Sequence, residues 1–91
     1  MPEVTIRAFA SLKEIFGAEN TFSVAAGATV YSCIEAFANA SGKCGELFDA
    51  GGLKPHIILM YNRERIDAED AKEIALSDGD EIVLYPPVSG G

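Results

Sequence analysis

The 91-residue chain is predicted to form a single α+β domain, in which one helix packs against one face of a β-sheet. Three observations lead to this prediction. Short segments that alternate between apolar and polar residues occur towards both ends of the chain, which is typical of half-buried strands. One longer segment between them repeats its apolar residues at helical spacing. Hydrophobic residues make up 48% of the chain and charged residues 23%, a balance typical of a folded globular domain.

The first part of the chain predicts two antiparallel strands joined by a helical turn. Residues 4–9 and residues 21–24 both alternate between apolar and polar side chains. Ser11 is expected to cap the turn between them, and Gly17 is expected to end it. So short a connection favours antiparallel pairing.

The one long helix is predicted to begin after Thr29, a residue suited to the N-cap position, and to end at Gly42. Its apolar residues recur at i, i+3, i+4, i+7 and i+8 and form one face: Val30, Cys33, Ile34, Phe37 and Ala38. We expect Cys33 to be buried and unreactive on this face, whereas Cys44 lies in a predicted loop. The spacing of the two cysteines indicates neither a disulfide nor a zinc site.

The second half predicts three more strands. A short turn at 44–48 and a loop at 49–52 lead to a strand at 56–61 that is apolar on both faces. Such a strand is covered on both sides or presents an apolar patch to a partner. A hairpin turn then leads to a short strand at residues 65–66, and residues 68–72 are compatible with one helical turn.

The last strand is predicted at residues 81–85, after a tight turn at 77–80 whose Ser, Asp and Gly residues favour it. Pro86 and Pro87 donate no ladder hydrogen bonds and end the pairing. The strand phases predict a core in which sheet residues pack against Val30, Ile34 and Phe37 of the helix. The sheet residues in this core are Val4, Ile6, Phe22, Val24, Ile57, Leu59, Ile82 and Leu84.

Charge and composition exclude several classes of function. The net charge of −7 disfavours nucleic acid and anionic membranes as partners and suits a partner with a basic docking surface. No run of apolar residues is long enough to span a membrane, and low cysteine content together with the absence of an apolar leader predicts a cytoplasmic protein.

The carboxyl end carries the most specific motif. Residues 86–91 form a slim tail that ends in Gly90 and Gly91, and glycine has no Cβ, so these residues fit a narrow slot in a partner. Six extended residues span about 20 Å, enough to reach into another protein's active site. The sequence therefore divides into a domain at residues 1–85 and a tail at residues 86–91. Tail residues that we expect to contact a partner are Pro86, Pro87, Val88 and Ser89.

The turn at 77–81 followed by an apolar strand and the tail at 86–91 resembles the small subunit of molybdopterin synthase, MoaD. The stretch at 52–56, with the strand and Tyr61-Asn62-Arg63 after it, is similar to the longer members of this MoaD/ThiS-type ubiquitin-like family, which include the small archaeal modifier proteins. The resemblance covers essentially the whole chain. It implies the β-grasp fold, with a mixed sheet of four to five strands, one main helix on one face and a flexible carboxyl-terminal tail.

The resemblance also implies a function. An E1-like activating enzyme, using ATP and magnesium, would adenylate the carboxylate of Gly91, and a sulfur donor would supply the sulfur that converts it to a thiocarboxylate. That sulfur would then serve molybdenum cofactor biosynthesis in a complex with the large subunit of molybdopterin synthase. In this interpretation the chain is a non-catalytic subunit and co-substrate that binds no cofactor itself.

Two alternatives remain open at this stage. The chain could be a ubiquitin-like modifier joined through Gly91 to lysines of target proteins, with its own Lys13, Lys43, Lys54 and Lys72 as further acceptors. It could instead be a thiamine-type sulfur carrier or a β-grasp binding module whose tail is incidental.

The remaining polar residues predict no catalytic or metal site. His56 has no nucleophile beside it in the pattern, and Asp78 with Asp80 is a turn-forming pair without the ligand spacing of a calcium loop. The acidic residues Glu64, Asp67, Glu69, Asp70 and Glu73 predict a solvated face that could also dock a basic partner.

The sheet face opposite the helix is the better candidate for recognition. The predicted phase places an apolar set there, beside the root of the tail: Phe9, Ile58, Met60, Val83 and Tyr85. Either this set is a docking surface, or residues 43–54 fold over it.

Overall fold

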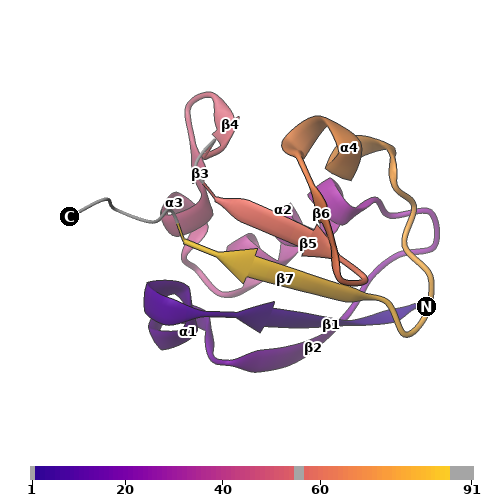
Figure 1. Cartoon of the computed structure of the whole chain (residues 1–91), viewed down its shortest axis with the longest axis horizontal. Helices are drawn as coiled ribbons and strands as arrows, with labels where there is room; N and C mark the ends of the chain where they lie inside the picture. Colours follow the sequence, from indigo (N-terminus) through magenta and orange to yellow (C-terminus); the bar gives the residue numbers. More distant parts are fainter. Residues whose placement is uncertain (1, 55–56, 87–91) are drawn as a thin grey trace.

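The computed structural model describes residues 2–54 and 57–86. Within these ranges the chain forms one mixed sheet, a small hairpin and four helices (Figure 1). The elements in chain order are β1 (Glu3–Ala8), α1 (Ala10–Phe16), β2 (Glu19–Ser23), α2 (Val30–Ala40), α3 (Cys44–Leu47), β3 (Phe48–Asp49), β4 (Gly52–Leu53), β5 (Ile58–Tyr61), β6 (Glu64–Ile66), α4 (Ala68–Glu73) and β7 (Glu81–Tyr85).

The main sheet has five strands in the order β2-β1-β7-β5-β6. The β1–β7 pair is parallel and the other three pairs are antiparallel, so the predicted mixed sheet is confirmed. β7 lies at the centre, and Ile82 and Leu84 on it have no exposed surface. The last strand before the tail is therefore the strand that the fold holds most firmly.

The predicted long helix is confirmed as α2, and it lies behind the sheet in Figure 1. Its start is fixed by a capping box, in which the Thr29 side chain accepts a hydrogen bond from the Ser32 amide (3.1 Å) and the Ser32 hydroxyl accepts one from the Thr29 amide (2.9 Å). Gly42 adopts a φ of 71° just after the helix. The predicted core is also confirmed, because every residue named for it is buried except Phe22, which is half-buried and packs against the others.

The prediction for the first helical turn was wrong in one respect. Helix α1 begins at Ala10, so Ser11 lies inside it, and the N-cap residue Phe9 makes no side-chain capping bond. Ala10 adopts a φ of 54°, an uncommon conformation for a residue with a Cβ. The residue before this corner, Phe9, stacks on Tyr85 on the sheet face opposite α2.

One further feature departs from the sequence prediction. Residues 48–53 form the small hairpin β3–β4, where a loop was expected. This hairpin is held against Tyr31 of α2. The Leu53 amide donates a hydrogen bond to the Tyr31 hydroxyl (3.1 Å), and the Phe48 and Tyr31 rings meet edge-on with their centroids 5.7 Å apart. The short turns predicted at 44–48 and 68–72 are confirmed as α3 and α4, which with α1 accompany the main helix.

Within the described residues, no helix has the length and apolar character needed to cross a membrane.

Candidate functional site

The carboxyl-terminal tail starts at the end of the central strand β7. At this end of the sheet β1 and β7 finish and β5 begins. Tyr85 is the last residue of β7, and the half-buried Pro86 follows it. The predicted tail residues Pro87, Val88, Ser89, Gly90 and Gly91 lie outside the described residues, as does His56. What the structure defines is the base from which the tail starts.

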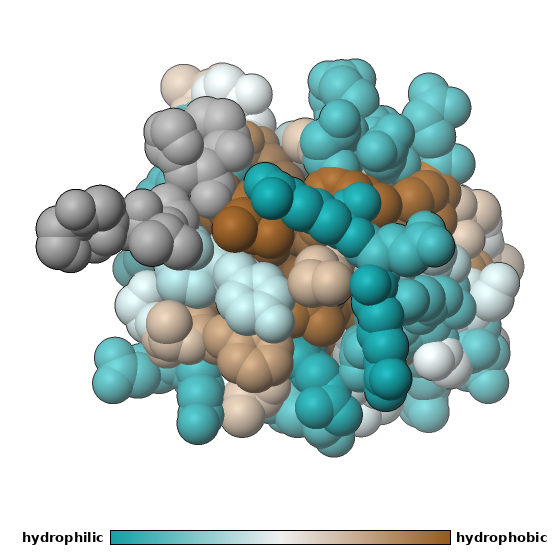
Figure 2. Space-filling model, viewed as in Figure 1, coloured by the Kyte–Doolittle hydropathy of each residue, from teal (hydrophilic) through white to brown (hydrophobic). Residues whose placement is uncertain are grey.

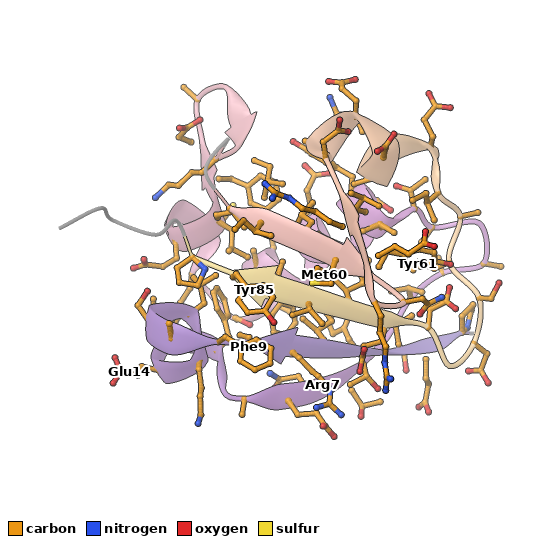
Figure 3. The ribbon with its side chains drawn as sticks, in the orientation of Figure 1. Arg7, Phe9, Glu14, Met60, Tyr61 and Tyr85 are labelled. Carbon is orange, nitrogen blue, oxygen red and sulfur yellow. The ribbon has the colours of Figure 1, made fainter. Side chains whose placement is uncertain are left out.

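The five residues predicted for the outward face do lie together on that face. Met60 is the cross-strand partner of Val83, and Ile58 is the partner of Tyr85. The Phe9 ring stacks on the Tyr85 ring, with centroids 4.7 Å apart and planes 10° from parallel. Figure 3 shows these two rings side by side, with Met60 on the neighbouring strand. We call Phe9, Ile58, Met60 and Tyr85 the apolar patch.

Exposure divides the predicted set. Phe9 is 39% exposed, and the other three members of the apolar patch are half-buried. Val83 is only 7% exposed, although it is not part of the core beneath α2. Val83 therefore forms the floor of the patch, and its four neighbours supply the surface that a partner can touch.

The alternative that residues 43–54 cover the patch is not what the structure shows for the described part of that segment. Leu47 is fully buried in the core, and the hairpin that follows is held by Tyr31 on the helix side. In Figure 1 the hairpin stands beside the sheet and does not cross it. The described residues of this segment therefore leave the patch uncovered.

Charged side chains border the apolar patch. Arg7 lies next to Val83 on the neighbouring strand, and it forms ion pairs with Glu19 (3.0 Å) and Glu81 (2.9 Å). On the other side, exposed Arg65 is the cross-strand partner of Met60. Figure 2 shows the brown and tan apolar residues in the middle of this face, with teal residues around and partly across them. An apolar centre inside a polar rim is the usual anatomy of a protein–protein interface.

The sequence analysis missed this arrangement around Arg7. The available signal was a basic residue at an outward position of the first strand, with acidic residues in the two strands that pair with it. Its partners could not be assigned without the strand order, because Glu19 and Glu81 lie on strands on opposite sides of β1.

A groove of about 320 Å³ adjoins the patch at Ile58. It runs between the start of β5 and the junction of β6 with α4, where Ile66 and Asp67 line it. Its mixed lining of apolar and charged side chains extends the surface that is available to a partner.

The acidic residues predicted as a solvated face are all exposed on β6 and α4. Asp67 caps α4 through a hydrogen bond from the Asp70 amide (2.8 Å), and Glu69 lies 3.7 Å from Lys72. Their docking role stays a prediction.

The turn before β7 is held by Asp80, as expected for a turn-forming residue. The Asp80 carboxylate accepts hydrogen bonds from the Tyr61 hydroxyl (2.6 Å), the Asn62 amide group (3.1 Å) and the Ser77 backbone amide (2.8 Å). Burial acts to raise the pKa of Asp80, but the three hydrogen bonds together outweigh it, and the pKa is lowered. The hydrogen bond from the Tyr61 hydroxyl to Asp80, together with burial, raises the pKa of Tyr61. This cluster fixes the start of the strand that carries the tail.

The two cysteines are free thiols in the structure. Cys33 lies on the buried face of α2, and this burial raises the pKa of its thiol to about 11. Cys44 is half-buried. Among residues 2–54 and 57–86 no group of histidine, cysteine, aspartate and glutamate side chains is arranged to hold a metal ion.

Comparisons with known proteins agree with this geometry. The model of the ThiS family matches residues 6–91. The chain is 33% identical to small archaeal modifier protein 3 of Haloferax volcanii, over 98% of this chain and 99% of that protein.

Two solved structures are similar in fold. The crystal structure of small archaeal modifier protein 1 from Haloferax volcanii superposes with a TM-score of 0.83 at 33% identity, covering 98% of this chain and 99% of that one. A chain in the crystal structure of the Amycolatopsis orientalis BexX/CysO complex superposes with a TM-score of 0.70 at 25% identity, covering 97% of this chain and 99% of that one.

Proposed function

Because the chain belongs to the ThiS family of ubiquitin-like proteins, we propose that it is a sulfur carrier whose reacting group is the carboxylate of Gly91. The observation that carries the proposal is the position of the tail's root. The tail starts from the buried central strand of the sheet, directly beside an open apolar patch. A partner that binds the patch is thereby placed to receive the tail.

The chemistry needs a partner because a carboxylate is a poor electrophile. An E1-like enzyme uses ATP and magnesium to form the acyl adenylate at Gly91, with release of pyrophosphate. A sulfur nucleophile from the sulfur donor then attacks the acyl carbon, and AMP leaves. This chain's part is to present the carboxylate. The stiff Pro86-Pro87 base limits the entropy lost when the tail is ordered in the partner's site.

We propose molybdopterin synthesis as the destination of the sulfur, with the large subunit of molybdopterin synthase as second partner. The support is the resemblance of residues 77–91 to the small subunit of that enzyme. In this role the chain is a co-substrate and not an enzyme. A thiamine-type acceptor uses the same tail chemistry and is distinguished by which synthase subunit the thiocarboxylate form binds.

The apolar patch is proposed as the docking surface for these partners. Large, clustered apolar side chains that are partly exposed next to a functional group are typical of binding hot spots. The net charge of −7 adds long-range attraction to a partner with a basic surface. A related protein, CysO, has been crystallised in complex with BexX, which agrees with partner binding in proteins of this fold.

Protein modification is the second candidate, and the similarity to small archaeal modifier proteins 1 and 3 favours it. Here a lysine amine takes the place of the sulfur nucleophile at the activated Gly91. Within the chain itself, Lys13 on α1 is exposed, whereas the amine of Lys43 donates to the Ile15 carbonyl (2.8 Å) and that of Lys72 lies 5.1 Å from the centre of the Tyr31 ring. Self-conjugation would therefore favour Lys13 over Lys43 and Lys72.

Isolation of the protein from its native cell separates the two candidates. Intact-mass analysis shows replacement of one oxygen by sulfur if the chain is a carrier. Immunoblots show a ladder of larger conjugates if it is a modifier. The matched control lacks Gly90 and Gly91 and shows neither. A protein that shows neither change while its full tail is intact would contradict the proposal.

A further inference from the structure

Strand β2 is an edge strand of the main sheet, and no further strand is described beside it (Figure 1). Hydrogen bonds to the other elements show which way its backbone groups point. The Thr5 amide bonds to Asp80 on the β7 side, whereas the Ala8 amide bonds to Ala18 and the Val24 amide bonds to Pro2. Since the bonded pairs of an antiparallel ladder alternate, Val4 with Phe22 and Ile6 with Asn20 are the bonded pairs of β1 and β2.

It follows that the amides and carbonyls of the alternate residues in β2 point away from the sheet. These residues are Glu19, Thr21 and Ser23, and all three are exposed. Among the described residues their outward backbone groups have no partner. An edge of this kind can pair with an added strand. The opposite edge, β6, has only three residues, two of them charged, and is a poorer template.

A groove of about 300 Å³ lies directly beside this open edge. Phe22 and Val24 form its wall on the sheet side, and Ala28, Cys33 and Ala36 line its side towards α2. The groove is hollow because small residues occupy the α2 side, where larger ones would fill the space. The Phe22 ring is held upright by an edge-on contact with Phe37, with centroids 5.7 Å apart. None of the residues that line the groove is charged.

Two carboxylates near the open edge favour a basic ligand. Glu35 precedes Ala36 on the exposed side of α2, next to the groove, and Glu3 lies opposite Ser23 in the ladder, on the outward face of the sheet. Neither forms an ion pair among the described residues. Arg7, the only basic residue of β1 and β2, is already neutralised by Glu19 and Glu81. The free charge around this site is therefore negative.

The geometry points to a peptide-binding site: the β2 edge and its groove take an extended segment of a partner protein that has alternating apolar residues and basic residues at its ends. The segment adds a sixth strand beside β2, so that Thr21 and Ser23 bond to its backbone. Every second side chain enters the groove. A second copy of this chain is a poor occupant, because each copy carries a net charge of −7 and the same carboxylates. The site lies away from the tail and does not depend on the chemistry of Gly91.

The test measures binding of synthetic peptides to the full chain. Each peptide has a central segment in which valine alternates with threonine, and two lysines flank this segment at each end. Addition of peptide is expected to change the NMR amide chemical shifts of Thr21, Ser23 and Ala36. The amide shifts of Met60 and Tyr85 should not change. A peptide methylated at alternate backbone nitrogens loses binding, because it cannot pair with β2. A peptide with glutamate in place of each lysine binds at least about ten-fold more weakly.

Two matched variants locate the site. Ala36 and Ala40 are both exposed on α2, but only Ala36 lines the groove. Ala36→Gln fills the groove without a charge and is expected to weaken binding by about ten-fold or more, whereas Ala40→Gln leaves it unchanged. Deletion of Gly90 and Gly91 leaves binding unchanged, which separates this proposal from sulfur carriage.

Several outcomes would overturn the inference. These are no peptide binding at millimolar concentration, amide shifts confined to β6, equal binding of the lysine and glutamate peptides, or equal effects of the two alanine variants. Self-association of the chain through β2, detected by sedimentation, would replace the partner peptide with a second copy.

Discussion

Substitution of Met60 by glutamate tests whether the apolar patch docks the activating enzyme. Met60 lies between Val83 and Arg65 on the outward face. In the free protein the change removes the packing of a half-buried side chain, which costs about 1 kcal/mol. The new carboxylate faces Arg65 across the strand pair, and such a pair restores about 0.2–1 kcal/mol. The fold should therefore lose less than about 1 kcal/mol of stability.

Binding should change much more than stability. A charge in the centre of a desolvated interface, opposite apolar partner groups, costs about 2 kcal/mol or more, which corresponds to roughly a 30-fold increase in Kd. Titration calorimetry with the E1-like enzyme measures this directly, and urea unfolding measures the stability of the same variant.

Ala40→Glu is the matched control, because Ala40 is exposed on α2, across the sheet from the patch, and does not line the groove beside β2. It makes the same change in charge and should leave Kd within about two-fold, as expected for a rim or non-contact site. Equal affinity of Met60→Glu and the unchanged protein would refute the docking role of the patch. Equal loss in both variants would assign the effect to net charge and not to this surface.

Three further predictions concern the body that holds the tail. Asp80→Asn removes the charge and one of the two carboxylate oxygens that accept from Tyr61, Asn62 and Ser77, and it should cost about 1–3 kcal/mol in urea unfolding. Because the folded pKa of Asp80 is lowered, its contribution to stability is present above the unfolded pKa and is lost as pH falls through the folded value; a variant whose stability shows the same acid dependence as the parent would contradict this. Leu84→Ala opens a cavity beside β7, because the Leu84 side chain has no exposed surface. The free energy of unfolding should fall by about 2–5 kcal/mol, and Tm by about 4–8 °C for each kcal/mol. A Tm within a few degrees of the parent would show that β7 is not the anchor of the tail. Burial raises the pKa of Cys33 to about 11, so Cys33 should react with iodoacetamide more slowly than Cys44 at neutral pH. Peptide mapping after timed alkylation measures the two rates, and faster labelling of Cys33 would show that the core opens readily.

Much of the fold followed from local pattern. The alternation in β1 and the helical spacing from Val30 to Ala38 identified the core because each pattern has only one face that can be buried. The corner at Ala10 could not be found this way. Ala10 has a positive φ, which is uncommon for a residue with a Cβ, and the preceding Phe9 stacks on Tyr85, a residue far away in the sequence. The hairpin at 48–53 was missed for a similar reason, since its partner is Tyr31 on α2 and not a neighbour in the chain.

The candidate site was predictable in part. Strand phase placed Phe9, Ile58, Met60 and Tyr85 on one face, and the ladder between β5 and β7 confirms this. Phase alone did not show that Val83 is buried, because burial on the outward face depends on which side chains flank it on both neighbouring strands. Strand order, which sequence patterns do not encode, decided both the floor of the patch and the charges around it.

The most direct test of the account is the mass of the protein as its native cell makes it. The account predicts a fraction of the chain in which sulfur replaces one oxygen, with fragment masses that place the change at Gly91. This fraction should disappear when the E1-like enzyme is deleted. A chain whose Gly91 carries only its ordinary carboxylate in cells with an active E1-like enzyme and sulfur donor would contradict the account.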